Sequence, residues 1–310
     1  MLSKFLPSVI IVLFLASCAT REKIKVAKKT IPNQISKLQN IAITPGEILL
    51  VRIPISQEIP SSYVPQSLQC RGSDISLITQ PTEYWAFLGE SYFSKLEPYE
   101  CFLKYQVEDE VISTKIISVT VAKREFRKEK LKVDPRRVTL SPEDLKRVML
   151  EQQELNRIYS ASLEGPLFQK EFKQPMRSRI TSSYGTQRLF NGTKQGQHLG
   201  IDFRAKIGTK VPAVNRGKVV LARELFYTGN TIIIDHGLKI FSVYGHLSKL
   251  NVNEGDIVDI GDIVGRVGNT GRTSGPHLHW GVKLNGDWLD GLSLIDASKA
   301  FGKVYATKVD

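Results

Sequence analysis

Short runs of β-branched and aromatic residues dominate the hydrophobic pattern between residues 38 and 122. The runs cover residues 48–53, 84–88, 101–107 and 111–121, and several prolines separate them. Short strands divided by turn residues are typical of β-sandwiches. We therefore expect residues 38–122 to form a small β-sandwich. Because this segment holds no catalytic constellation, we expect it to be a spacer or positioning domain, with a separate binding activity as the alternative.

One helix is expected after this sandwich. The sequence Ser-Pro-Glu-Asp at residues 141–144 supplies an N-cap serine, a proline for the first helical position and acidic side chains for the first turn. A partial apolar stripe continues to Tyr159, and we expect it to pack between two domains. Residues 123–137 are rich in lysine and arginine, which suits a solvated linker or a segment that grips an anionic polymer. Residues 123–165 are therefore assigned as a basic linker and a helix.

Glycine turns and short strands dominate residues 166–310, so the fold class is expected to be mainly β. The sequence Gly-Asp-Ile-Val occurs at residues 255–258 and again at residues 261–264. Such repeats resemble those of biotinyl and lipoyl carrier domains. A carrier domain needs an exposed lysine at a hairpin tip, however, and only Asp259 and Ile260 lie between the two copies. The carrier function is therefore the weaker hypothesis.

Two segments of the C-terminal region place polar residues on one face of an expected strand. Apolar residues alternate with polar or small ones, so His198 and Asp202 would share a face, and Gly200 would leave room for an ion. The same alternation puts His277 and His279 on one face. Two imidazoles and one carboxylate are a known catalytic zinc set, with a fourth place left for water. If the two strands are neighbours, three ligands can converge on one ion.

A metallopeptidase also needs a group that accepts a proton from water. The chain lacks a His-Glu-x-x-His motif, so no glutamate is an obvious base. The candidates are His246, in Tyr-Gly-His-Leu, and His277, since a neutral imidazole with a pKa of about 6.5 suits this task. His236 lies in Asp-His-Gly, which is typical of a turn. We expect His236 to have a turn or surface role.

Three motifs occur in order along this region: His-x-Gly-x-Asp, Tyr-x-His-Leu and Gly-x-x-Ser-Gly-Pro-His-Leu-His-Trp. They closely resemble the lysostaphin/LytM zinc endopeptidases over about residues 175–290. The resemblance implies that residues 166–310 form an antiparallel β-sheet catalytic domain. Loops at about residues 186–197, 223–230 and 268–276 would wall its groove. The implied site consists of His198, Asp202 and His279 as ligands of one Zn2+ ion per chain, with His246 and His277 as catalytic histidines.

The function implied by the resemblance is hydrolysis of an amide bond in peptidoglycan cross-links, preferably the bond between D-alanine and a diamino acid. Some relatives have lost zinc ligands and act as non-catalytic scaffolds that activate cell-wall amidases. Because this chain keeps all three ligands and both histidines, we expect an enzyme. Arg188 is expected to line the groove wall without being a catalyst. Relatives often continue with Asp-Pro where this chain has Asp290 and Gly291, which affects only the expected C-terminal boundary.

The N-terminus has the pattern of a lipoprotein signal peptide. Lys4 precedes an apolar stretch at residues 9–15, and Leu-Ala-Ser-Cys at residues 15–18 matches a lipobox. We expect residues 1–17 to be removed, Cys18 to carry lipid and residues 18–37 to act as a tether. The alternative is an ordinary signal peptide with an incidental cysteine. Ala19 after the cysteine favours an outer membrane, with the protein on its periplasmic side.

The chain has a formal net charge of +12, which favours an anionic partner. Nucleic acid, an anionic membrane surface and the cell wall all satisfy that condition. Export argues against nucleic acid, so we expect peptidoglycan and a membrane contact through the lipid anchor. The protein is expected to be a monomer. Cys70 and Cys101 would form a disulfide or remain two buried free thiols.

Overall fold

The computed structural model describes residues 38–55, 59–131, 140–192 and 194–306. The expected signal peptide, the expected lipidation site at Cys18 and the expected tether lie outside the described residues. The part of the chain that is described belongs to one compact unit. None of its helices has the length and apolar character required to cross a membrane.

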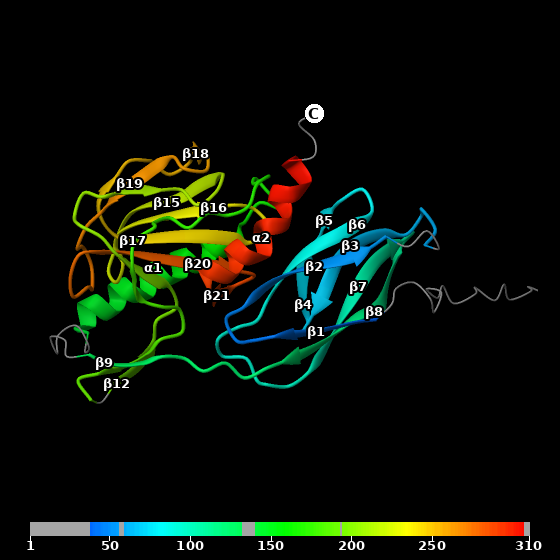
Figure 1. The fold of residues 1–310 in the computed structure, drawn as a ribbon, viewed down its shortest axis with the longest axis horizontal. Helices are drawn as coiled ribbons and strands as arrows, with labels where there is room; N and C mark the ends of the chain where they lie inside the picture. The colour runs from blue at the N-terminus through cyan, green and yellow to red at the C-terminus, as the bar shows by residue number, and fades with distance from the viewer. Residues whose placement is uncertain (1–37, 56–58, 132–139, 193, 307–310) are drawn as a thin grey trace, which may run out of the picture. The chain divides into compact units, whose positions relative to one another are not determined.

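The N-terminal region consists of two β-sheets that share a hydrophobic core (Figure 1). The five-stranded sheet has the order β1 (Gln39–Ile43), β8 (Glu110–Val121), β7 (Tyr99–Val107), β3 (Val64–Cys70) and β4 (Ser73–Ser76). The three-stranded sheet has the order β2 (Ile48–Pro54), β6 (Glu83–Gly89) and β5 (Ile78–Thr79). Strand β1 pairs with β8 in parallel, and the other pairs in these sheets are antiparallel. A mainly β fold with an N-terminal β region is thus confirmed.

The middle of β6 is buried on both faces, which explains why residues 85–88 are apolar without a break. Ala86 and Leu88 point into the core shared with the five-stranded sheet. Trp85 and Phe87, on the opposite face, belong to the core of the C-terminal region. Strand side chains alternate between faces, so a strand covered on both sides has no position for a solvated polar residue.

Cys70 and Cys101 are opposite one another on β3 and β7. The structure joins them by a disulfide across this strand pair. Both cysteines are buried in the N-terminal core. The bond therefore ties the middle of the five-stranded sheet.

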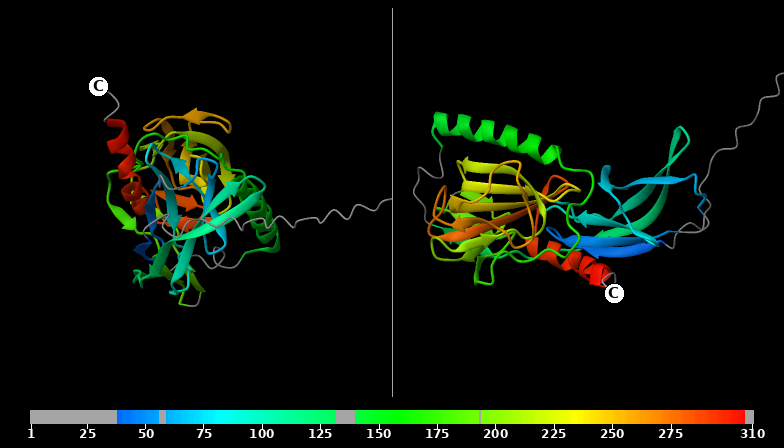
Figure 2. Two further views of the ribbon diagram at one scale, coloured as in Figure 1. Left: turned by 90° about the vertical axis from the view of Figure 1, so that its right-hand side faces the viewer. Right: turned by 90° about the horizontal axis from the view of Figure 1, so that it is seen from above.

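Helix α1 (Pro142–Ser160) begins where the capping pattern places it. The Asp144 backbone N–H donates to Ser141 Oγ at 3.1 Å. The helix packs through Tyr159 against Leu221 and Phe241 of the C-terminal sheet, along which it runs in Figure 2. The expectation that it packs between two domains is wrong, because its buried apolar stripe has its partners in that sheet.

The C-terminal region is built on a ten-stranded antiparallel sheet. Its main order is β10 (Ile180–Ser182), β13 (Ile201–Arg204), β20 (His277–Leu284), β17 (Ile240–Leu250), β16 (Gly229–Asp235), β15 (Gly217–Leu225) and β18 (Ile257–Val258). The remaining members are β14 (Lys210–Pro212), β19 (Ile263–Val267) and β21 (Asp287–Leu289). The two Gly-Asp-Ile-Val copies contribute β18 and the start of β19.

A small sheet beside this one includes part of the basic linker. Strand β9 (Lys128–Leu131) pairs in parallel with β11 (Gln187–Phe190), which forms a hairpin with β12 (Lys194–Gln197). The sequence pattern did not predict a strand in the linker. The hairpin lies in the segment expected to wall the groove.

Helix α2 (Gly291–Ala306) connects the two regions, since it packs against β2 and β20. The ring of Phe301 contacts Trp85 edge-on, with 4.9 Å between ring centroids. Asp290 immediately precedes α2. Its Oδ2 accepts a hydrogen bond of 2.7 Å from Arg124, and its Oδ1 accepts one from the Leu292 N–H. The Asp290-Gly291 departure from the family pattern therefore lies at the contact between the two regions. The domain boundaries expected from the sequence remain predictions.

Candidate metal centre

The register of two neighbouring strands fixes the centre of the candidate site. Asp202 on β13 is directly opposite His279 on β20. On the other side of β20, Gly245 of β17 is opposite the same histidine. The alternation expected for residues 277–280 is present, because Leu278 and Trp280 are fully buried while His277 and His279 are partly accessible. The two histidines therefore share the face on which Asp202 lies.

His198 reaches this face from outside the strand. We expected His198 and Asp202 to lie on one strand, but that expectation is wrong, since β13 begins only at Ile201. The chain bends at Gly200, where an added Cβ atom would be 2.4 Å from His279 Cε1 and 3.0 Å from the Trp280 carbonyl oxygen. Gly200 thus permits a close approach that brings both side chains to His279.

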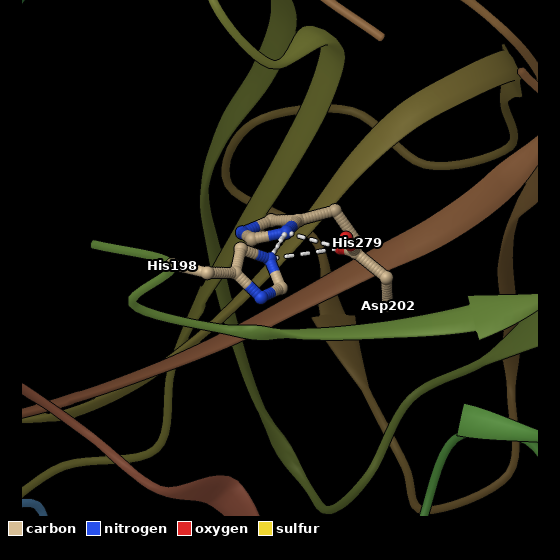
Figure 3. Close-up of side chains that lie close together, drawn as sticks. All are labelled: His198, Asp202 and His279. Carbon is tan, nitrogen blue, oxygen red and sulfur yellow. Dashed lines mark hydrogen bonds and ion pairs between the residues drawn. The ribbon is translucent and has the colours of Figure 1, made fainter. Parts of the chain in front are cut away.

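Three donor atoms converge at the centre of the site (Figure 3). His198 Nε2 lies 3.0 Å from Asp202 Oδ1, and His279 Nδ1 lies 2.9 Å from the same oxygen. The two imidazole nitrogens are 3.1 Å apart. The structure therefore brings together the three residues that the resemblance named as ligands.

The other nitrogen of His198 is directed away from this cluster. His198 Nδ1 lies 3.3 Å from the Ser183 carbonyl oxygen. A carbonyl oxygen only accepts hydrogen bonds, so Nδ1 carries the proton and the Nε2 lone pair faces Asp202 and His279. An imidazole held by a carbonyl group in this way is a typical metal ligand.

Burial and hydrogen bonding act in opposite directions on the ionisable groups of the cluster. Burial by itself would raise the pKa of the Asp202 carboxyl group. The close contacts with the His198, His277 and His279 imidazoles outweigh that effect and hold the pKa of Asp202 well below its usual range. Burial lowers the pKa of His198. The ionised carboxylate and the neutral His198 imidazole are the protonation states in which both groups bind metal.

His246 and His277 lie beside the cluster with their rings 4.7 Å apart. His246 Nδ1 is 2.8 Å from the Thr270 carbonyl oxygen, and His277 Nδ1 is 2.8 Å from the Gly275 carbonyl oxygen. Both Nδ1 atoms must therefore donate, which leaves each Nε2 atom available. His277 Nε2 lies 3.5 Å from Asp202 Oδ1, so it is directed towards the donor cluster.

The two histidines differ in the direction of their pKa shifts. Burial, together with repulsion from His279 and His277, lowers the pKa of His246 to about 3. For His277, burial is opposed by the Asp202 carboxylate, and the net effect raises its pKa. At pH 7 His246 is therefore neutral, with a lone pair that can accept a proton, whereas His277 holds a proton more readily.

A backbone irregularity turns the His246 side chain into the site. His246 has a φ of 60°, in the left-handed region that few non-glycine residues adopt. Its N–H donates to the Thr228 carbonyl oxygen at 2.6 Å, and β17 shifts register against its neighbours around this point. Strained backbone of this kind clusters at functional sites. The sequence pattern gave no signal for it.

Arg188 and His236 lie in different surroundings from those expected. Arg188 is on β11 in the expected wall segment, but it also donates to Asp202 Oδ2 at 3.1 Å. His236 lies between β16 and β17, as expected for a turn, yet it is completely buried. Its Nδ1 contacts the Arg216 carbonyl oxygen and its Nε2 contacts Ser242 Oγ, each at 2.8 Å. A surface role for His236 is therefore wrong, because both ring nitrogens have buried partners.

The donor set fits a divalent transition metal. Two imidazole nitrogens and one carboxylate oxygen on largely buried side chains are the ligands of catalytic zinc sites. The supporting contacts fit as well, since Ser183 holds His198 and Arg188 holds Asp202. Among the residues that the structure describes, no second group of histidine, cysteine and acidic residues meets the same distance criterion.

Known proteins match this part of the chain. Residues 196–291 match the model of Peptidase family M23. Peptidoglycan DD-endopeptidase ShyA of Vibrio cholerae is 42% identical over 109 residues, which are 35% of this chain and 25% of ShyA. Lysostaphin of Staphylococcus simulans is 42% identical over 96 residues, or 30% of this chain and 20% of lysostaphin. The chain therefore spans a quarter or less of the length of these two relatives.

One solved structure is similar to a larger part of this chain. A Pseudomonas aeruginosa protein assigned to peptidase M23 is 27% identical, with a TM-score of 0.61, and the match covers 82% of this chain and 95% of that one. This match includes most of the N-terminal region as well as the C-terminal sheet. With the three ordered motifs and the converging side chains, these similarities show that residues 196–291 form a Peptidase family M23 domain.

Proposed function

We propose that this protein is a zinc metalloendopeptidase that hydrolyses amide bonds in the peptide cross-links of peptidoglycan. The observation that carries the proposal is the convergence of His198 Nε2, Asp202 Oδ1 and His279 Nδ1 beside two further histidines. The names of two relatives, peptidoglycan DD-endopeptidase and lysostaphin, support the substrate class.

His198, Asp202 and His279 would hold one zinc ion per chain. When bound, zinc supplies Lewis acidity that makes water a stronger acid and polarises a carbonyl group. The carboxylate of Asp202 offsets part of the positive charge at this buried position. The imidazoles would add directional bonds through His198 Nε2 and His279 Nδ1, the two nitrogens that face the cluster.

His246 and His277 would move the protons of the reaction. His246 stays neutral at pH 7, because burial and the neighbouring histidines lower its pKa, so its Nε2 can accept a proton from water. His277 has a raised pKa and can donate a proton to the leaving amine. Loop carbonyl groups at Thr270 and Gly275 fix the tautomer of each ring, which keeps Nε2 as the reactive atom of both.

Within peptidoglycan, we favour the bond between D-alanine and a diamino acid as the substrate. Two proteins similar to this chain are named DD-endopeptidases, ShyA and ShyB of Vibrio cholerae. The formal net charge of +12 would attract an anionic cell-wall polymer. A non-catalytic scaffold that activates amidases is the alternative, and it is disfavoured because all three metal donors and both histidines are in place.

The decisive experiment measures bound zinc and the products of peptidoglycan digestion on the same protein. We expect about one zinc ion per chain and new uncross-linked peptides that mass spectrometry assigns to a cleaved D-alanyl bond. A chelator should abolish cleavage, and added zinc should restore it. Metal-free protein that leaves cross-linked peptidoglycan intact, even with zinc added, would reject the proposal and favour the scaffold.

We also propose that Cys18 carries a lipid that anchors the protein to a bacterial membrane, with the outer membrane favoured. The support is the lipobox at residues 15–18. Incorporation of labelled palmitate into the wild-type protein, and its loss in Cys18→Ser, is the expected result. Equal labelling of both proteins, or labelling of neither, would contradict the anchor without affecting the catalytic proposal.

A further inference from the structure

The two oxygens of the Asp202 carboxylate face different partners. Oδ1 faces the imidazoles, at 3.0 Å from His198, 2.9 Å from His279 and 3.5 Å from His277. Oδ2 faces Arg188, whose Nη2 lies 3.1 Å away. The two oxygens of a carboxylate are chemically equivalent, so the contact of one oxygen with Arg188 fixes the orientation of the carboxylate plane relative to the imidazoles.

Arg188 is itself held by a second hydrogen bond and by β-sheet pairing. Its Nη2 also donates to Ser182 Oγ at 2.9 Å. The residue lies on β11, opposite Gly196 of β12 and opposite Glu129 of β9. The side chain is mostly buried, so it does not sample the range of conformations of a surface arginine.

The linker strand places a second carboxylate near this guanidinium group. Glu129 Oε2 lies 3.8 Å from Arg188 Nε, which is buried and has no hydrogen-bond partner within the described residues. Glu129 is also mostly buried, and its other oxygen is 3.4 Å from Arg127 Nη2. The guanidinium group of Arg188 therefore has two carboxylates nearby, those of Asp202 and Glu129. Neither Glu129 nor Arg188 is within residues 196–291, which match the family model.

We propose that Arg188, held in place by Glu129 of the linker strand, is a positioning residue that fixes the Asp202 carboxylate for metal binding. The proposal rests on the metal centre inferred above and extends it to the segment that joins the two regions. On this account, β9 is part of the functional unit, because it helps to support a metal ligand from outside residues 196–291, which match the family model.

The chemistry of arginine explains why this residue type is required. A guanidinium group is planar and always charged, and it can hold two acceptors in fixed directions. A lysine would keep the charge but would contact its partners from one point. Groups that hydrogen-bond metal ligands typically change metal affinity by about 10- to 100-fold when they are removed. Arg188→Ala should therefore weaken zinc binding by about that factor, and Arg188→Lys should weaken it less.

The test measures zinc affinity by competition with a chromophoric chelator, independently of catalysis. Arg188→Ala and Arg188→Lys are compared with Arg216→Ala, which removes an exposed arginine paired with Asp259 in the same region. Arg216→Ala should keep wild-type affinity. The thermal midpoint of the metal-free proteins reports on folding. Wild-type zinc affinity in a folded Arg188→Ala protein would overturn the proposal.

Glu129→Gln tests the contribution of the linker and remains informative if Arg188→Ala does not fold. Its control is Glu125→Gln, which removes a carboxylate that pairs with Lys123 on the surface. We expect a several-fold loss of zinc affinity in Glu129→Gln and none in Glu125→Gln. An unchanged affinity in Glu129→Gln would overturn the role of the linker. If the wild-type protein binds no zinc, the proposed function fails instead, so the two failures are distinguishable.

Discussion

At the scale of single residues, the tautomers of the site histidines are set by carbonyl groups that accept a hydrogen bond from Nδ1. Thr270 and Gly275, both in the loop before β20, serve His246 and His277, and Ser183 serves His198. The loop thus orients two side chains that approach the site from different strands. The ordered sequence motifs identified these histidines as candidate site residues. No sequence pattern identifies the carbonyl groups, because a backbone acceptor can belong to any residue.

Replacing His246 separates proton transfer from metal binding. In His246→Ala the three donor atoms at His198, Asp202 and His279 remain, so zinc content should be unchanged. Loss of a proton acceptor typically lowers the rate by about 100- to 10,000-fold, and kcat for a cross-linked muropeptide should fall within that range. Loss of zinc from this variant, or turnover at the wild-type rate, would show that His246 has another role.

His236 should make the stability of the protein depend on pH. Burial lowers its pKa from about 6.5 to about 4, so between these values the unfolded chain binds a proton that the folded chain does not. The contribution of the neutral His236 to the free energy of unfolding is then fully present above about pH 6.5, and it is lost as the pH falls towards 4. For this residue the loss between pH 7 and pH 5 is about 2 kcal/mol. Urea unfolding at pH 7 and at pH 5 measures the change in the free energy of unfolding between the two pH values. This change should be smaller in His236→Asn than in wild type by about that amount.

At the scale of elements, the site depends on strand register and on one close approach. The alternation of apolar and polar residues predicted the face that carries His277 and His279, and β20 has that face. It failed for His198, which precedes β13, since periodicity does not reveal a bend at a glycine. It also failed for β9, whose basic side chains resemble those of a solvated linker. Pairing with a strand about sixty residues away is a tertiary contact that local sequence does not encode.

Gly200→Ala should disturb the site through this close approach. The added Cβ atom would lie 2.4 Å from His279 Cε1 and 2.7 Å from His279 Nε2, so the imidazole has to leave the position in which its Nδ1 meets Asp202. Zinc affinity should fall by about 10-fold or more, while most of the fold is retained. Gly165→Ala is the matched control, because nothing lies within 4 Å of its added Cβ atom. Equal zinc affinity in both variants would mean that the site accommodates the methyl group.

At the scale of the whole molecule, one sheet is shared by two hydrophobic cores. Trp85 of β6 packs with Phe301 of α2 in the C-terminal core, whereas Leu88 of the same strand packs in the N-terminal core. The hydrogen bond from the Ile48 N–H to Ser293 Oγ and the ion pair of Arg124 with Asp290 connect the same regions. If the chain were divided near residue 122, where the strand pattern predicted a domain boundary, both separated regions would therefore expose large aromatic side chains to solvent.

The shared sheet predicts that the two regions unfold together. Truncation of a buried tryptophan or leucine typically costs about 2–5 kcal/mol, and in a coupled molecule either loss lowers a single transition. Calorimetry of the full chain should give one transition for wild type, with a lower midpoint in Trp85→Ala and in Leu88→Ala. Phe93→Ala is the control, because that ring is 65% exposed and its removal should leave the midpoint unchanged. If Leu88→Ala lowers one transition and leaves a second in place, the N-terminal region unfolds independently, and the boundary near residue 122 separates two autonomous domains.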